Sequence, residues 1–159
     1  MIQLLLKRKL IIGILLISTG FAFAAENIEE LRRAGDSALA QGDYLTARYY
    51  FERIRESENW NEYPFRIDIL NKLGMIHESQ SQYKEASEQY REVLEISKKE
   101  ENNDANNTLF YYELRYADCL ERAGFYSRAQ EMYQKILDKA PPNVKPTILQ
   151  RIIHNYGFL

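Results

Sequence analysis

The 159-residue chain is long enough for one small domain or for an array of two to four short repeats. Hydrophobic residues make up 45% of it and charged residues 28%, which is a globular rather than a disordered composition. The formal net charge of −2 argues against a nucleic-acid partner, because binding a phosphate backbone requires a clustered basic face. With only seven glycines and four prolines, the composition favours helices over a turn-rich β fold.

The first 24 residues have the pattern of an export signal. Residues 7–9 are Lys-Arg-Lys, and an uncharged run of 15 residues follows and ends in Ala-Phe-Ala, which fits a small-x-small cleavage site. The run is shorter than the roughly 20 residues that a membrane span requires. We therefore expect a signal peptide over residues 1–24 and a periplasmic location. An uncleaved anchor that leaves the chain facing the periplasm is the alternative, and it would be the chain's only contact with a membrane.

Removal of the signal would shift the net charge from −2 to −5, because residues 1–24 carry three basic and no acidic side chains. Cys119 is the single cysteine, so no intramolecular disulfide can form. The stability of a small exported chain of this kind must then come from packing.

Three segments each predict two amphipathic helices joined by a tight turn, at about 27–57, 65–99 and 108–141. The polar stretch 102–107, rich in Asn and Asp, predicts a loop before the third segment. The segment 143–159 predicts one last helix, which we expect to cap the array. The apolar side of this helix would carry Ile148, Leu149, Ile152, Ile153 and Tyr156, and its polar side Gln150, Arg151, His154 and Asn155.

The three segments align on their turns, at Gly42, Ser81 and Gly124. A small residue stands seven positions before each turn and an alanine five positions after it, which lets the paired helices approach closely. Large aromatic residues stand two and nine positions after each turn, and an aliphatic residue stands twelve after it, where they can fill the core. In chain order these positions are Gly35, Gly74 and Ala117; Tyr44, Tyr83 and Tyr126; Ala47, Ala86 and Ala129; Phe51, Tyr90 and Tyr133; Ile54, Val93 and Ile136.

This register resembles the tetratricopeptide repeat, most clearly in Leu73-Gly74…Tyr83…Ala86…Tyr90 and in Gly42-Asp43-Tyr44…Ala47…Phe51. The resemblance covers about residues 27–142. The turns lie 39 and 43 residues apart, against about 34 in the family, so the chain is similar to its long-period variants. The common tryptophan of the family is replaced by Leu31, Leu70 and Glu113, which weakens the first helix of the third segment most.

The resemblance implies an all-α fold, an α-solenoid of three helix-turn-helix pairs over residues 25–142 with a C-terminal cap helix, in an exported bacterial protein. It also implies a non-enzymatic adaptor or scaffold that binds a protein or peptide partner in a concave groove lined by the first helix of each pair. By register, the groove-facing residues are Arg32, Asp36, Asn71, Lys72, Met75, Tyr111, Leu114, Arg115 and Asp118, together with Glu78 and Arg122.

Some members of the family clamp a peptide carboxylate with Lys, Arg and Asn at set groove positions. The corresponding residues here are Arg32, Asp36, Lys72, Tyr111 and Arg115. Asp36 would repel a carboxylate and Tyr111 lacks a charge, so we do not expect this clamp. Apolar contacts from Met75, Tyr111 and Leu114 are expected instead, with Arg32, Lys72 and Arg115 as polar contacts.

The sequence contains no catalytic or metal-binding motif. His77 and His154 lie in different segments without cysteines or paired carboxylates at ligand spacing. A Gly-rich phosphate loop, HExxH and Gly-x-Ser-x-Gly are absent from the sequence. We therefore expect no enzyme activity, no metal and no cofactor. His77 is expected to pack against its turn, and Cys119 to be a small buried thiol.

Two alternatives stand beside the adaptor. The repeats could self-associate as a structural envelope protein, a homo-oligomer joined through the cap helix or through the connector that carries Trp60, Tyr63 and Phe65. The chain could also be an accessory subunit of an envelope-polymer hydrolase. The hydrolase itself would need a second catalytic domain, for which the chain has no room.

Overall fold

The computed structural model describes residues 27–62, 64–99 and 105–158, and every regular element within them is helical. The predicted signal peptide and Tyr63 lie outside the described residues. In chain order the elements are α2 (Ile28–Ala40), α3 (Tyr44–Arg55), the short 3-10 helix η1 (Trp60–Glu62), α4 (Arg66–Ser79), α5 (Tyr83–Lys99), α6 (Ala105–Arg122), α7 (Tyr126–Lys139) and α8 (Lys145–Tyr156).

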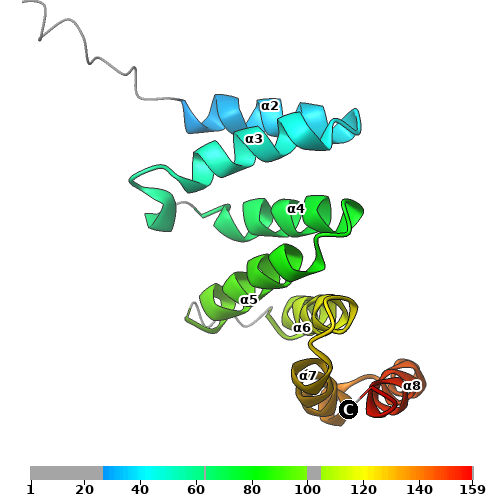
Figure 1. Ribbon diagram of the computed structural model, residues 1–159. Coiled ribbons are helices and arrows are strands. Elements are labelled where there is room, and N and C mark those ends of the chain that lie inside the picture. The colour runs from blue at the N-terminus through cyan, green and yellow to red at the C-terminus, as the bar shows by residue number, and fades with distance from the viewer. Residues whose placement is uncertain (1–26, 63, 100–104, 159) are drawn as a thin grey trace, which may run out of the picture.

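The helices stack in antiparallel pairs, α2 with α3, α4 with α5 and α6 with α7, and α8 packs on α7 at the far end (Figure 1). The main contacts run between helices that are neighbours in the sequence, which is the architecture of a solenoid. The predicted all-α solenoid of three helix pairs with a terminal helix is confirmed. In the part of the chain that is described, no helix is both long and apolar enough to cross a membrane.

The three predicted turn residues share one backbone conformation. Gly42, Ser81 and Gly124 have φ angles of 75°, 59° and 83°, in the left-handed region. In each turn the next residue donates its N–H to a carbonyl five residues earlier, as Phe125 does to Leu120 at 2.8 Å. This is the hydrogen bond that ends a helix in a Schellman motif, so each first helix stops at the same point of the repeat.

The core confirms the reason for the small residue before each turn. A methyl group on Gly35 would lie 2.5 Å from a ring carbon of Phe51, and one on Gly74 would lie 2.7 Å from a ring carbon of Tyr90. The aromatic residue nine positions after each turn is fully buried in all three pairs, as are the alanines and aliphatic residues of the register. In the first two pairs, close approach of the helices therefore depends on the absence of a side chain where the ring sits.

The predicted extent of the loop before the third helix pair is wrong. The polar stretch 102–107 is not a loop throughout, because α6 begins at Ala105. The first backbone N–H groups of a helix have no intrahelical partner, so its first turn tolerates polar residues that the pattern attributes to a loop.

The faces of α8 also differ from the prediction. Its apolar residues are split: Ile148 and Ile152 are buried against the preceding helices, whereas Leu149, Ile153 and Tyr156 are exposed. Asn155, which was placed on the polar side, is completely buried. The helix is rotated so that only one edge of its wide apolar stripe faces the core.

The connector between the first two pairs folds back on the core. Trp60 lies in η1 and is buried, and Phe65 packs against the core with the Arg32 guanidinium 5.7 Å from its ring centroid. Trp60 is therefore a packing residue and is not presented to a partner.

Candidate functional site: the face of the first helices

The predicted binding residues lie on α2, α4 and α6, and charged contacts join these helices in succession. We call the outward residues of α2, α4 and α6 that the register predicts as binding residues, together with Asp68 of α4 and Glu121 of α6, the first-helix face. Asp36 of α2 contacts Lys72 of α4, and Glu78 of α4 contacts Arg115 of α6. Residues that are 36 and 37 positions apart in the chain are thus adjacent, as the repeat register requires.

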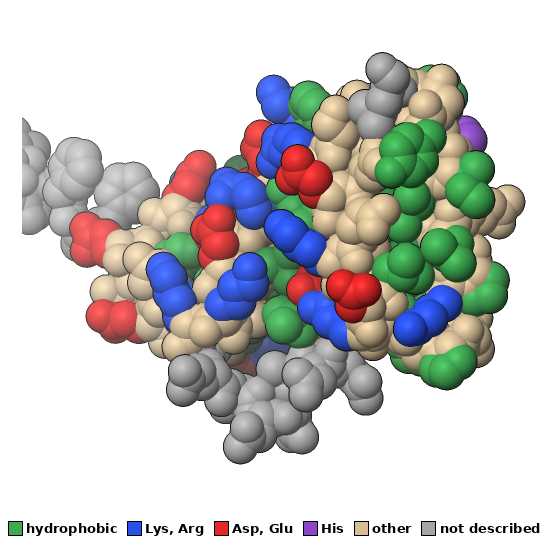
Figure 2. Space-filling view, turned by 90° about the horizontal axis from the view of Figure 1, so that it is seen from below, with side chains coloured by type: hydrophobic (Ala, Val, Ile, Leu, Met, Phe, Trp, Pro, Cys, Tyr) green, Lys and Arg blue, Asp and Glu red, His purple; other side chains and the backbone are tan. Residues whose placement is uncertain are grey.

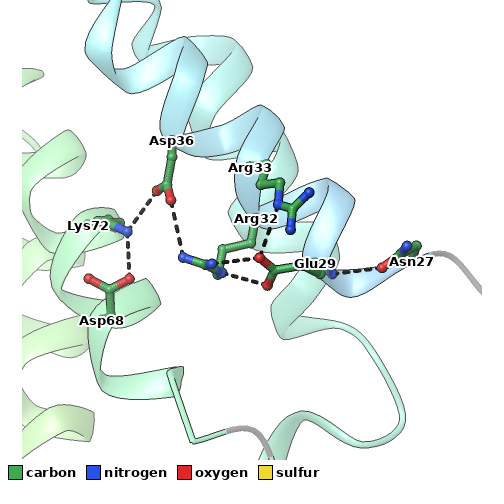
Figure 3. A network of polar contacts seen from close by, with 7 residues as sticks. All are labelled: Asn27, Glu29, Arg32, Arg33, Asp36, Asp68 and Lys72. Carbon is green, nitrogen blue, oxygen red and sulfur yellow. Dashed lines mark hydrogen bonds and ion pairs between the residues drawn. The ribbon is translucent and has the colours of Figure 1, made fainter.

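The junction between α2 and α4 is a network of six charged groups, in which Arg33 also contacts Glu29 (Figure 3). The ammonium of Lys72 lies 2.7 Å from Asp36 and 2.5 Å from Asp68. Arg32 lies 3.4 Å from Asp36 and donates to both carboxylate oxygens of Glu29. Burial alone would lower the pKa of Lys72, but its hydrogen bonds to Asp36 and Asp68 more than offset this and raise it. The two partly buried cations of this network, Arg32 and Lys72, are therefore neutralised within the protein.

The junction between α4 and α6 is built differently. Glu78 accepts a hydrogen bond from the Tyr90 hydroxyl at 2.7 Å and pairs with Arg115 at 2.6 Å. Arg115 also lies over the rings of Tyr90 and Tyr111, 5.7 and 5.9 Å from their centroids. Burial, and then the hydrogen bond to Glu78, raises the pKa of Tyr90 well above its usual range, so its hydroxyl stays a neutral donor.

A glutamate, a tyrosine and an arginine also meet at the junction between α6 and α8. Glu121 accepts from the Tyr133 hydroxyl at 2.8 Å and pairs with Arg151 at 3.1 Å, and His154 lies 3.3 Å from the same carboxylate. The Tyr133 hydroxyl also lies 2.5 Å from Asp118. Burial, followed by the hydrogen bond to Asp118, raises the pKa of Tyr133.

We call this Glu–Tyr–Arg arrangement a clasp. Each clasp takes Glu three positions before a turn, Tyr nine positions after it, and Arg from the next first helix. The first pair has Leu39 and Phe51 at the Glu and Tyr positions, so it lacks both the carboxylate and the hydroxyl. Sequence reasoning named Glu78 and Arg115 only as groove positions, and it did not recognise Glu121. The sequence does contain a sign of the clasp. The residue three positions before the turn is Glu in the two pairs whose buried aromatic residue is Tyr, and Leu in the pair where it is Phe.

The remaining predicted residues differ in how accessible they are. Met75 and Tyr111 are the exposed large apolar side chains among the described residues of α2, α4 and α6, with 44% and 43% of their surface open. Leu114 is half-buried against the core. Asn71 is half-buried, and its buried Oδ1 lacks a hydrogen-bond partner.

The other candidate chemical groups are packing residues, as predicted. His77 is buried, and its Nδ1 lies 2.8 Å from the Gln82 side-chain oxygen in the turn. Cys119 is buried, and burial, followed by the Glu78 carboxylate, raises the pKa of its thiol to about 12. Within the described ranges no three His, Cys, Asp or Glu side chains are grouped in a way that could hold a metal ion.

Comparison with known proteins supports this view of the fold. Residues 27–99, which hold the first two helix pairs, match the family model described as the tetratricopeptide repeat. No curated protein matches the chain.

Among solved structures, the chain is similar to a variant of nearly identical TPR-like repeats, described as a kinesin light chain from Podosopora anserina. The TM-score is 0.63 at 16% sequence identity, and the match covers 89% of this chain and 71% of the other. At this identity the likeness concerns the fold. Residues 27–99 are thus assigned to the tetratricopeptide repeat by the family match, and the helical solenoid that contains them has the fold of TPR-like repeats.

Proposed function

We propose that this protein is an exported, non-enzymatic adaptor of the bacterial cell envelope, and that its first-helix face binds a helix or peptide of a partner protein. Tetratricopeptide repeats are interaction modules, which supports the general class. The observation that carries the proposal is the pair of exposed apolar side chains, Met75 and Tyr111, on a face whose charges are mostly paired with one another. The export pattern of residues 1–24 supports the location.

The pairing of the charges favours an apolar anchor over a carboxylate ligand. Lys72 already contacts Asp36 and Asp68, and Arg115 already contacts Glu78. A ligand carboxylate would have to displace these protein carboxylates. An amphipathic segment that covers Met75 and Tyr111 would leave all of these ion pairs in place.

Tyr111 has the properties of a binding anchor. Its ring is held beside the Arg115 guanidinium, so little conformational entropy is lost when a partner covers it. Tyrosine is also among the residues that most often dominate binding energy at protein interfaces. Met75 is flexible and polarisable, and it adapts to the shape of what it contacts.

The test is a pull-down from the envelope fraction with Met75→Ala/Tyr111→Ala as the bait variant. Arg115 is retained, because its loss would leave the largely buried Glu78 carboxylate without its cation. The matched control is Leu45→Ala/Tyr49→Ala, which removes two exposed apolar side chains from α3. We expect the bait variant to weaken the affinity by at least about tenfold and the control to leave it unchanged.

Equal recovery of the partner by the wild-type chain and by both variants would contradict the assignment of the site. The location has its own test, a C-terminal reporter enzyme that is active only after export. Reporter activity that survives deletion of residues 1–24 would contradict the proposed export signal.

A further inference from the structure

The outer face of α8 carries a continuous stripe of exposed apolar side chains. Leu149, Ile153 and Tyr156 are spaced four and three residues apart, so they lie on one side of the helix. Ile153 is 70% exposed and Tyr156 60%. Phe158, beyond the helix end, is not part of the stripe, because its ring stacks on Tyr126 of α7. Hydrophobic side chains gather at this end of the molecule in Figure 2. A terminal helix that only caps a solenoid would present a polar outer face.

The clasp shows how α8 is oriented. Arg151 meets Glu121 as Arg115 meets Glu78, so α8 occupies the position of the first helix of a further repeat. Two residues after the clasp arginine, α6 has Ala117, and Ile153 stands at this position in α8. In α6 this position is fully buried, whereas Ile153 is largely exposed, with no described residue covering it.

The size of the residue at the position of Ile153 determines what can pack against the helix there. Within the pairs, Gly35 and Gly74 allow an aromatic ring to approach the helix backbone directly. Ile153 excludes such an approach, because its side chain occupies the space that the ring needs. The stripe is therefore built to meet another surface side chain against side chain, as two helices do at an interface between separate chains.

We propose that the apolar stripe of α8 packs against α8 of a second copy of the chain. The two helices run antiparallel about a two-fold axis near Ile153. The arrangement places Ile153 against its own counterpart and Leu149 against Tyr156 of the other copy. The stripe is uncharged, and the two basic side chains between Leu149 and Tyr156, those of Arg151 and His154, both lie against Glu121. Two copies can then meet without burying like charges, which a self-complementary interface requires.

The exposed area is large enough for this contact. An aromatic side chain presents about 150–250 Å² when it is fully exposed, so Tyr156 offers on the order of 100 Å². With Leu149 and Ile153 the patch is roughly 300 Å², which is at the lower end of patches that serve as binding sites. Two patches and their polar rim come to about 800 Å² in total, which is the size of a weak contact and indicates a reversible dimer.

The test is disulfide cross-linking of the full chain carrying Ile153→Cys. An added oxidant such as copper phenanthroline takes two electrons from the two thiols and joins them. We expect a reducible dimer from Ile153→Cys and none from the control Tyr49→Cys, which is also exposed but lies on α3. The native thiol, Cys119, is buried and should contribute no background. Mixing chains that carry Leu149→Cys with chains that carry Tyr156→Cys should give a mixed dimer, which tests the antiparallel direction.

Sedimentation equilibrium provides the second measurement. Ile153→Asp should weaken dimerisation of the full chain by at least about tenfold, because it places two carboxylates together at the axis, while its circular dichroism stays that of the wild type. A monomeric wild type without cross-linking would overturn the proposal. A cross-link from Ile153→Cys to a different protein would also overturn it, because the occupant would then not be a second copy. Met75→Ala/Tyr111→Ala should dimerise as the wild type does, so failure of the adaptor proposal would be seen separately.

Discussion

At the scale of single residues, the three turns share one left-handed backbone conformation but differ in the residue that adopts it, which is glycine in two turns and serine in the third. Ser81 is the non-glycine residue with a positive φ among the described residues, and it stands where Gly42 and Gly124 stand in the other pairs. A residue with a Cβ atom pays about 1–2 kcal/mol for this conformation. Glycine avoids that cost but loses more conformational entropy on folding.

We therefore expect Ser81→Gly to raise the free energy of unfolding by about 0.5–1 kcal/mol, as measured by urea denaturation. Gly42→Ser places a serine in the equivalent turn of the first pair and should lower the free energy of unfolding by a similar amount. A change in the same direction for both variants would show that the cost of a side chain in the left-handed conformation does not determine the stability of these turns.

Cys119 gives a second prediction at this scale. The thiolate is the reactive form, and burial followed by the Glu78 carboxylate raises the pKa of the thiol to about 12. In the folded protein the rate of maleimide labelling should stay low at pH 8 and keep rising beyond pH 10. In the denatured chain it should level off near the ordinary cysteine pKa of about 8.5. Fast labelling of the folded chain at pH 8 would contradict the buried position.

At the scale of helices, α8 combines good and poor packing. Ile148 and Ile152 are buried, but Asn155 is also fully buried, and neither atom of its side-chain amide has a hydrogen-bond partner. Each such group costs about 1–3 kcal/mol. The equivalent positions, four residues after the clasp cation in α6 and after Lys72 in α4, hold Cys119 and Ile76.

Asn155→Leu should therefore stabilise the protein by about 1–2 kcal/mol, because leucine has a similar shape and leaves no polar atom unpaired. Thermal unfolding followed by circular dichroism measures the change. The matched control is Gln150→Leu, at an exposed position of the same helix, which should have little effect. A lower melting temperature for Asn155→Leu would mean that the amide makes a contact that stabilises the fold.

The same helix shows the limit of sequence patterns. The apolar residues of α8 at 148, 149, 152, 153 and 156 form a stripe too wide to be buried on one side, and periodicity does not say which edge faces the core. The clasps were missed for a related reason. Glu121 and Arg151 are 30 positions apart, and only the superposition of successive repeats brings them together.

At the scale of the whole molecule, the repeat register predicted most of the fold. The turn residues, the small residue before each turn and the buried aromatic residue after it all stand where the sequence placed them. Packing within each pair follows from these positions, because the same register places a buried ring against a small residue. Accessibility on the first-helix face does not follow, since it depends on which charges pair across helices. That is why Met75 and Tyr111 stay exposed while Lys72 and Arg115 are paired with carboxylates of the protein.

The central claim is that the first-helix face binds a partner, and photo-cross-linking in intact cells tests it most directly. A photoreactive phenylalanine analogue replaces Tyr111 in one strain and Tyr49, on α3, in the other. Our account predicts one product from position 111 whose added mass is that of a different protein, and no such product from position 49. No product from position 111, or the same product from both positions, would contradict it.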